Sequence, residues 1–287
     1  MTLPDLNVPS LLKKHGITPK KSLGQNFLVD GSILRDIVNS AEVTAESAVL
    51  EIGAGLGSLT RVLANTCRRV IAVEIDSRLL PILQEVTSPF HNVEIVAGDM
   101  LKLNPADLLS NEQGYAVVAN IPYYITSALI RHLLEAPVQP NRLVLTVQRE
   151  VADRICAAPG DLSLLALSVQ VYGTPRIVLR IPAGAFYPSP DVDSAVLRVD
   201  LHPQPLIPPA DMDTFFKLAR AGFSQKRKTL RNALSGGLGW APDRTTAMLT
   251  QAGIDPQRRA ETLRLDEWAQ LTIHYYLEAT HNERTGY

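Results

Sequence analysis

Residues 47–58 read SAVLEIGAGLGS, and this stretch decides the fold. Its first half, Ser47–Ile52, is an apolar run typical of a strand that is buried on both faces in a parallel sheet. Its second half contains Gly53, Gly55 and Gly57. These glycines let the backbone turn sharply, let a ligand approach it, and aim the following helix N-terminus at that ligand. The stretch therefore predicts a strand, a ligand-binding turn and a helix.

The same apolar pattern recurs along the first two thirds of the chain, with helix-like segments between the runs. The further strands are expected at Arg69–Ile75, Val93–Ala97, Tyr115–Ala119 and Arg142–Val147, and the helices at Leu59–Ala64, Leu79–Val86 and Glu150–Cys156. Later strands are expected at Leu164–Tyr172, Arg176–Leu179 and Ala195–Val199. This alternation predicts an α/β fold with a Rossmann-like sheet.

A proline-rich segment separates this sheet from the rest of the chain. His202–Asp211 contains four prolines, which can continue neither a strand nor a helix. Beyond it, helices are expected at Asp213–Leu234, Asp243–Gly253 and Asp266–Glu278, each opening on an aspartate suited to capping. The sequence thus predicts a sheet domain at 1–202 and a small all-helical domain at 203–287.

The composition is typical of a soluble globular protein, with 46% hydrophobic and 20% charged residues among 287. The N-terminal residues lack the apolar core of a signal peptide, and no apolar stretch is long enough to span a membrane. Cys67 and Cys156 have no CxxC partner, so neither a disulfide framework nor a zinc site is expected. We expect a cytoplasmic protein without a metal.

The net charge is only −1, but the basic residues are clustered. One acid-free segment, 10–29, contains Lys13, Lys14, Lys20 and Lys21. A second, 214–242, contains Lys217, Arg220, Lys226, Arg227, Lys228 and Arg231. Such segments indicate a local positive face. The alternative is a pair of ordinary solvated helices.

Two acidic residues follow the next strands and complete a site for a nucleoside. Glu74 ends the second strand, where a carboxylate can bind both hydroxyls of a ribose. Asp99 follows the third strand and is placed to reach the adenine of the same ligand. NAD is an alternative ligand, but its GxGxxG motif requires a third glycine where this chain has Ser58.

The fourth strand leads into Asn120-Ile121-Pro122-Tyr123-Tyr124, a pattern suited to methylating an aromatic amine. The lone pair of adenine N6 is delocalised into the ring, so the nitrogen must be drawn towards tetrahedral geometry before it attacks. The Asn120 side-chain oxygen and the Ile121 carbonyl can accept the two N6 hydrogens, and these bonds strengthen as positive charge develops on the nitrogen. Tyr123 offers a stacking face for an extruded base. These features predict transfer of a methyl group from S-adenosylmethionine (SAM).

The sequence resembles the ribosomal RNA adenine N6-dimethyltransferases of the KsgA (RsmA) type along nearly its whole length. The matching stretches are KKSLGQNFLVD (20–30), LEIGAGLGSLT (50–60), AVEID (72–76), GDML (98–101), NIPYYIT (120–126), QREVADRI (148–155), FYPSPDVDSAVLRV (186–199) and FSQKRKTLRNAL (223–234). The resemblance implies that Asn26 and Leu28 contact SAM together with Gly53, Glu74, Asp99 and Asn120. It also implies that Phe186 stacks on the target base opposite Tyr123.

The resemblance further implies a substrate and a cellular role. Family members dimethylate two adjacent adenosines in a hairpin loop near the 3′ end of 16S rRNA and take part in small-subunit assembly. We therefore expect a SAM-dependent enzyme, monomeric, that docks small-subunit rRNA through the helical domain. The basic residues expected to contact RNA are Lys20, Lys21, Lys226, Arg227, Lys228 and Arg231.

Two positions depart from the family pattern, and other functions stay open. Lys226 stands where the family usually has arginine, which loses bidentate binding of phosphate, and Asp191 replaces a lysine. The nearest alternative is an Erm-type enzyme, which modifies 23S rRNA and confers macrolide resistance. A non-catalytic rRNA-binding assembly factor is a second alternative. The sequence decides neither the target nucleotides, nor the order of methylation, nor whether the substrate is naked rRNA or a particle.

Overall fold

The computed structural model describes residues 4–109, 112 and 114–284. The chain divides into two compact units. The N-terminal unit comprises Met1–Asp153 and Pro175–Leu201, and the C-terminal unit comprises Arg154–Thr174 and His202–Tyr287. Each unit is therefore built from two separate stretches of chain.

A seven-stranded sheet forms the centre of the N-terminal unit. Its order is β4-β3-β2-β5-β6-β9-β7, and all the pairs from β4 to β6 are parallel, whereas β9 runs antiparallel to β6. The strands are β2 (Ala48–Ile52), β3 (Arg69–Glu74), β4 (Val93–Ala97), β5 (Ala116–Asn120), β6 (Arg142–Gln148), β7 (Gly173–Ile181) and β9 (Ser194–Leu201). The first five lie within about two residues of their predicted bounds.

The order of the strands reverses between β2 and β5. The chain proceeds from β2 outwards through β3 and β4 and returns to the other side of β2 at β5. Ligands of such sheets bind in the crevice at the carboxyl ends of the strands where the order reverses. Gly53 follows β2 and Asn120 ends β5, so the predicted glycine turn and amine motif flank this point.

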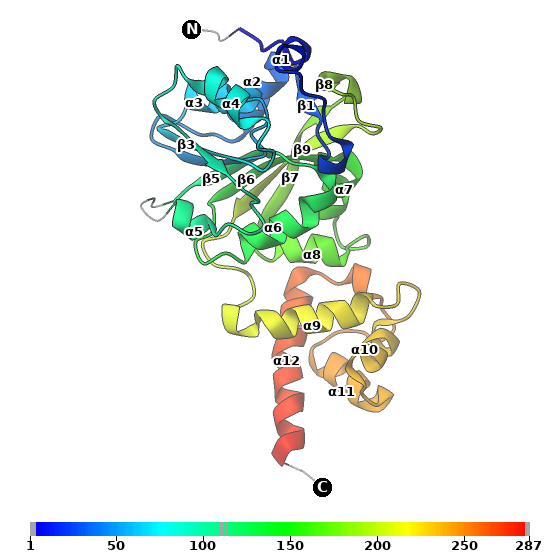
Figure 1. Ribbon diagram of the computed structural model, residues 1–287. Helices are drawn as coiled ribbons and strands as arrows, with labels where there is room; N and C mark the ends of the chain where they lie inside the picture. The colour runs from blue at the N-terminus through cyan, green and yellow to red at the C-terminus, as the bar shows by residue number, and fades with distance from the viewer. Residues whose placement is uncertain (1–3, 110–111, 113, 285–287) are drawn as a thin grey trace. The chain divides into compact units, whose positions relative to one another are not determined.

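Helices cover both faces of the sheet. In Figure 1, α2 (Gly31–Ser40), α3 (Ser58–Ala64) and α4 (Leu80–Thr87) lie on one face, while α5 (Pro105–Leu108) and α6 (Thr126–Leu134) lie on the other. The N-terminal α1 (Val8–Lys14) precedes them, and α7 (Arg149–Ile155) follows β6. A short antiparallel ribbon pairs β1 (Phe27–Leu28) with β8 (Phe186–Tyr187).

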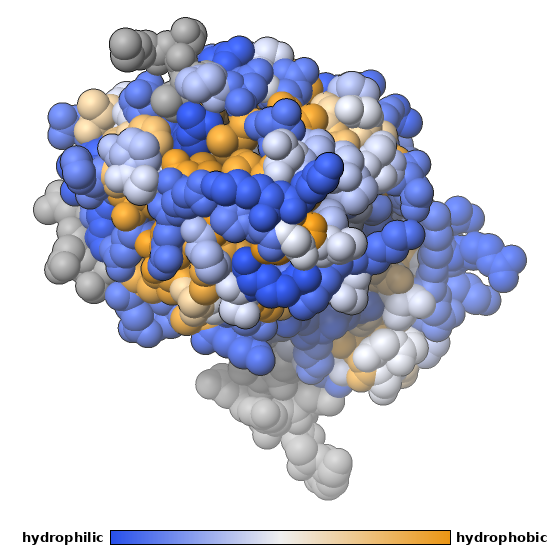
Figure 2. Space-filling model, turned by 45° about the horizontal axis from the view of Figure 1, so that its top comes forward, coloured by the Kyte–Doolittle hydropathy of each residue, from blue (hydrophilic) through white to orange (hydrophobic). Residues whose placement is uncertain are grey.

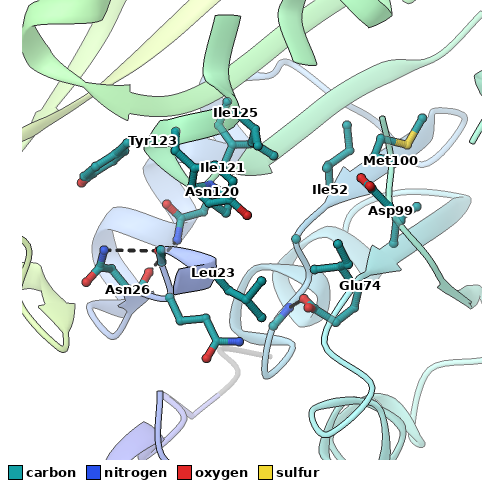
Figure 3. Close-up of a pocket in the computed structure, with 18 of the residues that line it drawn as sticks. Leu23, Asn26, Ile52, Glu74, Asp99, Met100, Asn120, Ile121, Tyr123 and Ile125 are labelled. Atoms are coloured by element: carbon teal, nitrogen blue, oxygen red, sulfur yellow. Dashed lines mark hydrogen bonds between the residues drawn. The ribbon is translucent and has the colours of Figure 1, made fainter. Parts of the chain in front are cut away.

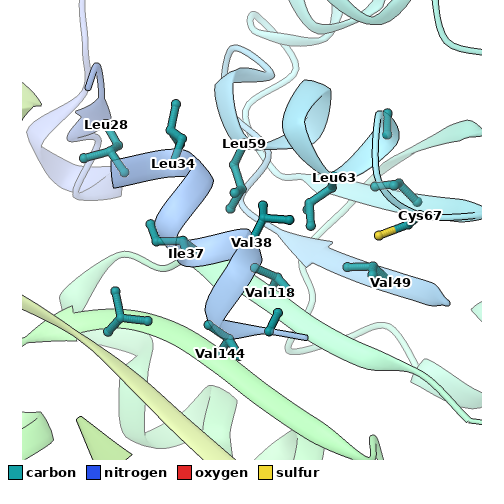
Figure 4. Packing of buried hydrophobic residues seen from close by; sticks show 14 of the residues in the cluster. Leu28, Leu34, Ile37, Val38, Val49, Leu59, Leu63, Cys67, Val118 and Val144 are labelled. Atoms are coloured by element: carbon teal, nitrogen blue, oxygen red, sulfur yellow. The ribbon is translucent and has the colours of Figure 1, made fainter. Parts of the chain in front are cut away.

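The core under α2 shows how sequence periodicity positions the sheet. Leu34, Ile37 and Val38 share one face of α2 and are almost fully buried. They pack against α3 and against β2, β5 and β6, as Figure 4 shows. Asp30 caps this helix by accepting hydrogen bonds from the amides of Ser32 and Ile33. The capped, buried helix fixes the preceding residues, 20–28, beside the sheet.

The C-terminal unit is all-helical. Its helices are α8 (Leu164–Gln170), α9 (Met212–Phe223), α10 (Leu230–Leu238), α11 (Pro242–Gln251) and α12 (Leu265–Arg284). Trp268 and Phe215 are fully buried in its core, and the Trp268 ring stacks on Phe223 with centroids 5.8 Å apart. A Cβ on Gly222 would lie 2.7 Å from Trp268, so this glycine permits the close packing.

Three local predictions were wrong. Leu164–Tyr172 was expected as a strand but forms α8, because Ser163 caps the helix and its leucines and alanine favour helix. Asp213–Leu234 is not one helix, because Thr229 caps a new helix by accepting from the Asn232 amide. The aspartates predicted as caps, Asp213, Asp243 and Asp266, lie inside the first turns instead, where they still favour the helix dipole.

The hydropathy of the surface and of the helices bears on membrane contact. Hydrophilic residues cover most of the face seen in Figure 2, with smaller apolar areas between them. No helix among the described residues is long and apolar enough to cross a bilayer.

Candidate functional site

A cavity of about 220 Å³ opens at the carboxyl ends of β2, β3, β4 and β5. It is lined by the glycine turn, by residues that follow β3 and β4, by the NIPYY segment and by residues 23–27. In Figure 3, Glu74, Asp99 and Met100 lie on one side of the cavity, and Asn26, Asn120 and Tyr123 lie on the other. The reversal point of the sheet therefore brings the predicted nucleoside site and the predicted amine site into one space.

Glu74 ties the glycine turn to the end of β3. Its carboxylate accepts hydrogen bonds from the amides of Gly55 and Asp76, each at 2.7 Å. Burial raises the pKa of Glu74, and the two backbone donors act against that effect. A carboxylate offers about four acceptor positions, so two remain for hydroxyl groups of a ligand. Glu74 is thus held in place while keeping capacity to bind.

Asp99 and two apolar side chains line the neighbouring part of the cavity. One oxygen of Asp99 accepts from the Leu101 amide at 3.1 Å. Met100 is buried, whereas Ile75 also lines the cavity and is 51% exposed. An apolar side chain left in water at a cavity wall is suited to contact with a flat ring.

Asn120, Ile121, Tyr123 and Phe186 lie on the other side. The Asn120 side-chain nitrogen donates to the Asn26 carbonyl at 3.1 Å. The Tyr123 hydroxyl shares a hydrogen bond of 2.7 Å with the hydroxyl of the buried Ser194 on β9, which fixes the ring. Phe186 is 5% exposed and lines the same cavity from β8. The four residues predicted to surround the target base are therefore close together.

Residues 18–28, which we call the strap, run from α1 towards α2 and form one wall of the cavity. Gln25 donates from its side-chain nitrogen to Asp76 at 2.8 Å, and its oxygen accepts from the Lys20 amide at 2.7 Å. Arg78 donates to Asp76 at 2.9 Å and to the Thr18 carbonyl at 3.4 Å. The sequence alone does not single out Gln25, Asp76 or Arg78, because polar residues in a turn carry no signal of their partners.

Two predicted cofactor residues do not line this cavity. The side chain of Leu28 is buried in the core beside α2 and lines a neighbouring small cavity of about 30 Å³, and its backbone pairs with Phe186. Gly57 has a φ of 85°, and a Cβ there would lie 3.0 Å from Leu83 and 3.1 Å from Val86. Gly57 therefore serves the left-handed turn and the packing of α3 on α4.

Glu51 is a buried acid beside the same turn. It is 1% exposed, and a small cavity of about 30 Å³ is lined by Glu51, Gly53, Gly55 and Asn120, among others. Among the described residues its Oε2 has no hydrogen-bond partner. Burial raises the pKa of Glu51 to about 8, and the neighbouring Glu74 adds to the effect. The cavity has room for one water.

The basic residues occupy loops and helix ends. Lys226, Arg227 and Lys228 are exposed in the turn between α9 and α10, and Arg231 is half-buried in the first turn of α10. The basic segment was expected as one continuous helix, but it consists of the end of α9, a turn, and the start of α10. In the other basic segment Lys20 and Lys21 are exposed, whereas Lys14 pairs with Glu85 at 2.6 Å. Across the described part of the chain, no cluster of three or more His, Cys, Asp or Glu could hold a metal ion.

Comparison with known proteins places the chain in a family. Residues 16–276 match the model of the family described as ribosomal RNA adenine dimethylase. A protein of Dehalococcoides mccartyi named ribosomal RNA small subunit methyltransferase A is 44% identical over 92% of this chain and 91% of its own length. The protein of the same name from Bacillus mycoides is 42% identical over 91% of this chain and 93% of its own.

Two solved structures share the fold. The crystal structure of the 23S rRNA methyltransferase ErmE is 30% identical, with a TM-score of 0.71 over 87% of this chain and 99% of that chain. A dimethyladenosine transferase from Plasmodium falciparum shares the fold, with a TM-score of 0.74 over 88% of this chain and 98% of that chain at 24% identity. The chain belongs to the ribosomal RNA adenine dimethylase family.

Proposed function

We propose that this protein transfers methyl groups from SAM to N6 of adenosines in small-subunit rRNA. The observation that carries the proposal is the single cavity that joins Glu74 and Asp99 to Asn120 and Tyr123. The family match and the small-subunit names of relatives at 42–44% identity support the substrate. By the same resemblance, the targets are two adjacent adenosines in the hairpin loop near the 3′ end of 16S rRNA.

Glu74 and Asp99 hold the nucleoside part of SAM. When SAM is bound, Glu74 would accept from its ribose hydroxyls and Asp99 from its adenine amine. Ile75 and Met100 would offer apolar contact to the adenine ring, a contact that would cover the exposed side chain of Ile75. Gly53 and Gly55 keep the wall of the cavity free of side chains where the ligand approaches.

Glu51 supplies the negative charge for the amino-acid part of SAM. Its unpartnered Oε2 lies beside a water-sized cavity next to the glycine turn. The ammonium group of the methionyl part, directly or through a water, would be the partner that the Glu51 Oε2 lacks. Asn26 and the strap backbone close the site over this part.

Asn120, Ile121, Tyr123 and Phe186 prepare the target base. When bound, SAM supplies a methyl group made electrophilic by its sulfonium sulfur. Tyr123 and Phe186 hold the extruded adenine between their rings, and such stacking is worth about 1–3 kcal/mol per base. The Asn120 oxygen and the Ile121 carbonyl accept the N6 hydrogens and localise the nitrogen lone pair. Once methylated, N6 carries a positive charge and loses a proton to water, so no strong base is needed.

The C-terminal unit and the strap provide contacts to the RNA backbone. Lys226, Arg227 and Lys228 are exposed in one turn, and the structure shows no ion pair for them within its described residues. Three like charges in a turn repel one another unless an anionic partner approaches. Arg231 extends this contact, and Lys20 and Lys21 of the strap provide a contact of their own. We propose a cytoplasmic protein that acts on rRNA as a monomer.

Mass spectrometry of rRNA tests the proposal. Purified protein and SAM are incubated separately with small and with large ribosomal subunits from a strain lacking the enzyme. We expect N6,N6-dimethyladenosine in the 16S rRNA of the small subunits and none in the 23S rRNA of the large subunits. Methylation of 23S rRNA alone would instead assign the Erm type, which the ErmE structure resembles. Binding without methylation of either rRNA would make the protein an assembly factor.

A further inference from the structure

The orientation of the Asn120 side chain is set by the strap. A backbone carbonyl only accepts hydrogen bonds, so the Asn26 carbonyl must face the NH₂ group of Asn120, as the 3.1 Å bond from Nδ2 shows. The Asn120 oxygen then points away from the strap. The amine of the target base is a donor, and in this orientation it faces the Asn120 oxygen. If the Asn120 amide were flipped, its NH₂ group would face the NH₂ group of the base.

The strap in turn is held by one side chain whose two ends have fixed roles. The oxygen of Gln25 accepts from the Lys20 amide inside the strap. The nitrogen of Gln25 is therefore left to donate, and it meets the Asp76 carboxylate at 2.8 Å. Gln25 immediately precedes Asn26, so this bond fixes the backbone beside the carbonyl that orients Asn120.

Asp76 is itself held firmly. It is 4% exposed and is bound by Arg78, and this hydrogen bond keeps the pKa of Asp76 far below its usual value. Its amide donates to Glu74, the proposed ribose ligand. The turn after β3 therefore connects the cofactor side of the cavity to the strap, and through the strap to Asn120.

We propose that Gln25 and Asp76 are positioning residues whose hydrogen bond locks the strap so that the Asn26 carbonyl turns the Asn120 oxygen towards the target amine. The inference rests on the proposed function, because it concerns methyl transfer to an amine. It assigns the two residues an effect on the chemical step in addition to any effect on SAM retention.

A polarity exchange tests this pair. Gln25→Glu keeps the acceptor for the Lys20 amide but sets a carboxylate against Asp76, and Asp76→Asn sets an amide NH₂ against the NH₂ of Gln25. The double variant Gln25→Glu/Asp76→Asn restores one donor and one acceptor and keeps the net charge of the wild type. Gln84→Glu, at an exposed position on α4, controls for an added carboxylate.

The measurement is kcat for methylation of small subunits at saturating SAM, with SAM affinity measured separately by calorimetry. We expect each single variant to lose at least about tenfold in kcat, since small misplacements at a reacting centre cost up to about 10²-fold. The double variant should lose clearly less than the product of the two single losses, with the remaining loss due to Arg78, which in wild type donates to the same Asp76 oxygen as Gln25. Gln84→Glu should match wild type.

Two results would overturn the inference. One is a wild-type kcat at saturating SAM in both single variants, with only their SAM affinity reduced. The pair would then serve cofactor retention alone. The other is a double variant as slow as the product of the two single losses. If the wild type itself transfers no methyl group to rRNA while binding SAM, the proposed function fails, whatever the variants do.

Discussion

Replacing Glu51 by glutamine should make the protein's stability less sensitive to pH. The pKa of Glu51 is raised from 4.5 to about 8 in the folded protein, chiefly by burial. Between these values the unfolded chain has released the proton and the folded chain has kept it, so stability falls as pH rises. Below pH 4.5 both states are protonated and the group has no effect. Glutamine does not titrate, so the variant lacks this loss.

The size of the effect follows from the two pKa values. Each unit of difference corresponds to about 1.36 kcal/mol. At pH 7 the loss in wild type is about 3 kcal/mol, and at pH 5 it is below about 1 kcal/mol. The free energy of unfolding of Glu51→Gln minus that of wild type should therefore increase by about 2–3 kcal/mol from pH 5 to pH 7.

Urea denaturation without ligand, followed by circular dichroism at pH 5, 6 and 7, measures this difference. Glu46→Gln, at an exposed position before the same strand, controls for the loss of one carboxylate. A difference that stays constant over these pH values would refute the reasoning, because Glu51 would then be ionised throughout. SAM should release a proton from Glu51 near pH 7, which calorimetry in buffers of different ionisation enthalpy detects.

Three further predictions concern the cofactor, the base and the RNA. Glu74→Ala should weaken SAM binding by about 1.5–3 kcal/mol, the range for hydrogen bonds to a charged group; unchanged affinity by calorimetry in a folded variant would remove Glu74 from the site. Tyr123→Ala should lose most methylation while SAM binds as in wild type, since stacking holds the base and not the cofactor; a near-normal rate would contradict the base pocket. Replacing Lys226, Arg227, Lys228 and Arg231 by glutamine should raise the KM for small subunits. It should also flatten the salt dependence of binding by roughly 0.7–0.9 log units per decade for each phosphate that the variant no longer neutralises. A slope equal to that of the wild type would mean that this turn is only solvated.

The sheet could be predicted from the sequence because its central strands are buried on both faces. Runs such as Ala48–Ile52 are continuously buried and apolar except for Glu51, and glycines or acids follow them at the edge where ligands bind. The same apolar signal failed at Leu164–Gln170, because composition alone does not separate a buried strand from a buried helix. There Ser163, as a cap, decides the outcome.

The sequence predicted those site residues whose role follows from their own chemistry and their place at a strand end. It did not predict residues whose role depends on a hydrogen-bond partner or on burial. Glu74, Asp99, Asn120 and Tyr123 follow strands, so their place at the sheet edge follows from topology. The bond between Gln25 and Asp76 joins positions 51 residues apart and leaves no periodic trace. Glu51 sits inside an apolar run, where only its burial, measured in the structure, distinguishes it from an exposed acid.

The division of the chain bears on how the C-terminal unit can be produced by itself. Because Arg154–Thr174 belongs to that unit, a fragment that starts at His202 lacks α8. Helix α8 contacts α9, so such a fragment leaves part of α9 uncovered. Expression of the unit therefore calls for a fusion in which a short linker replaces residues 175–201 and joins the two stretches, and truncation before His202 should give an aggregating product.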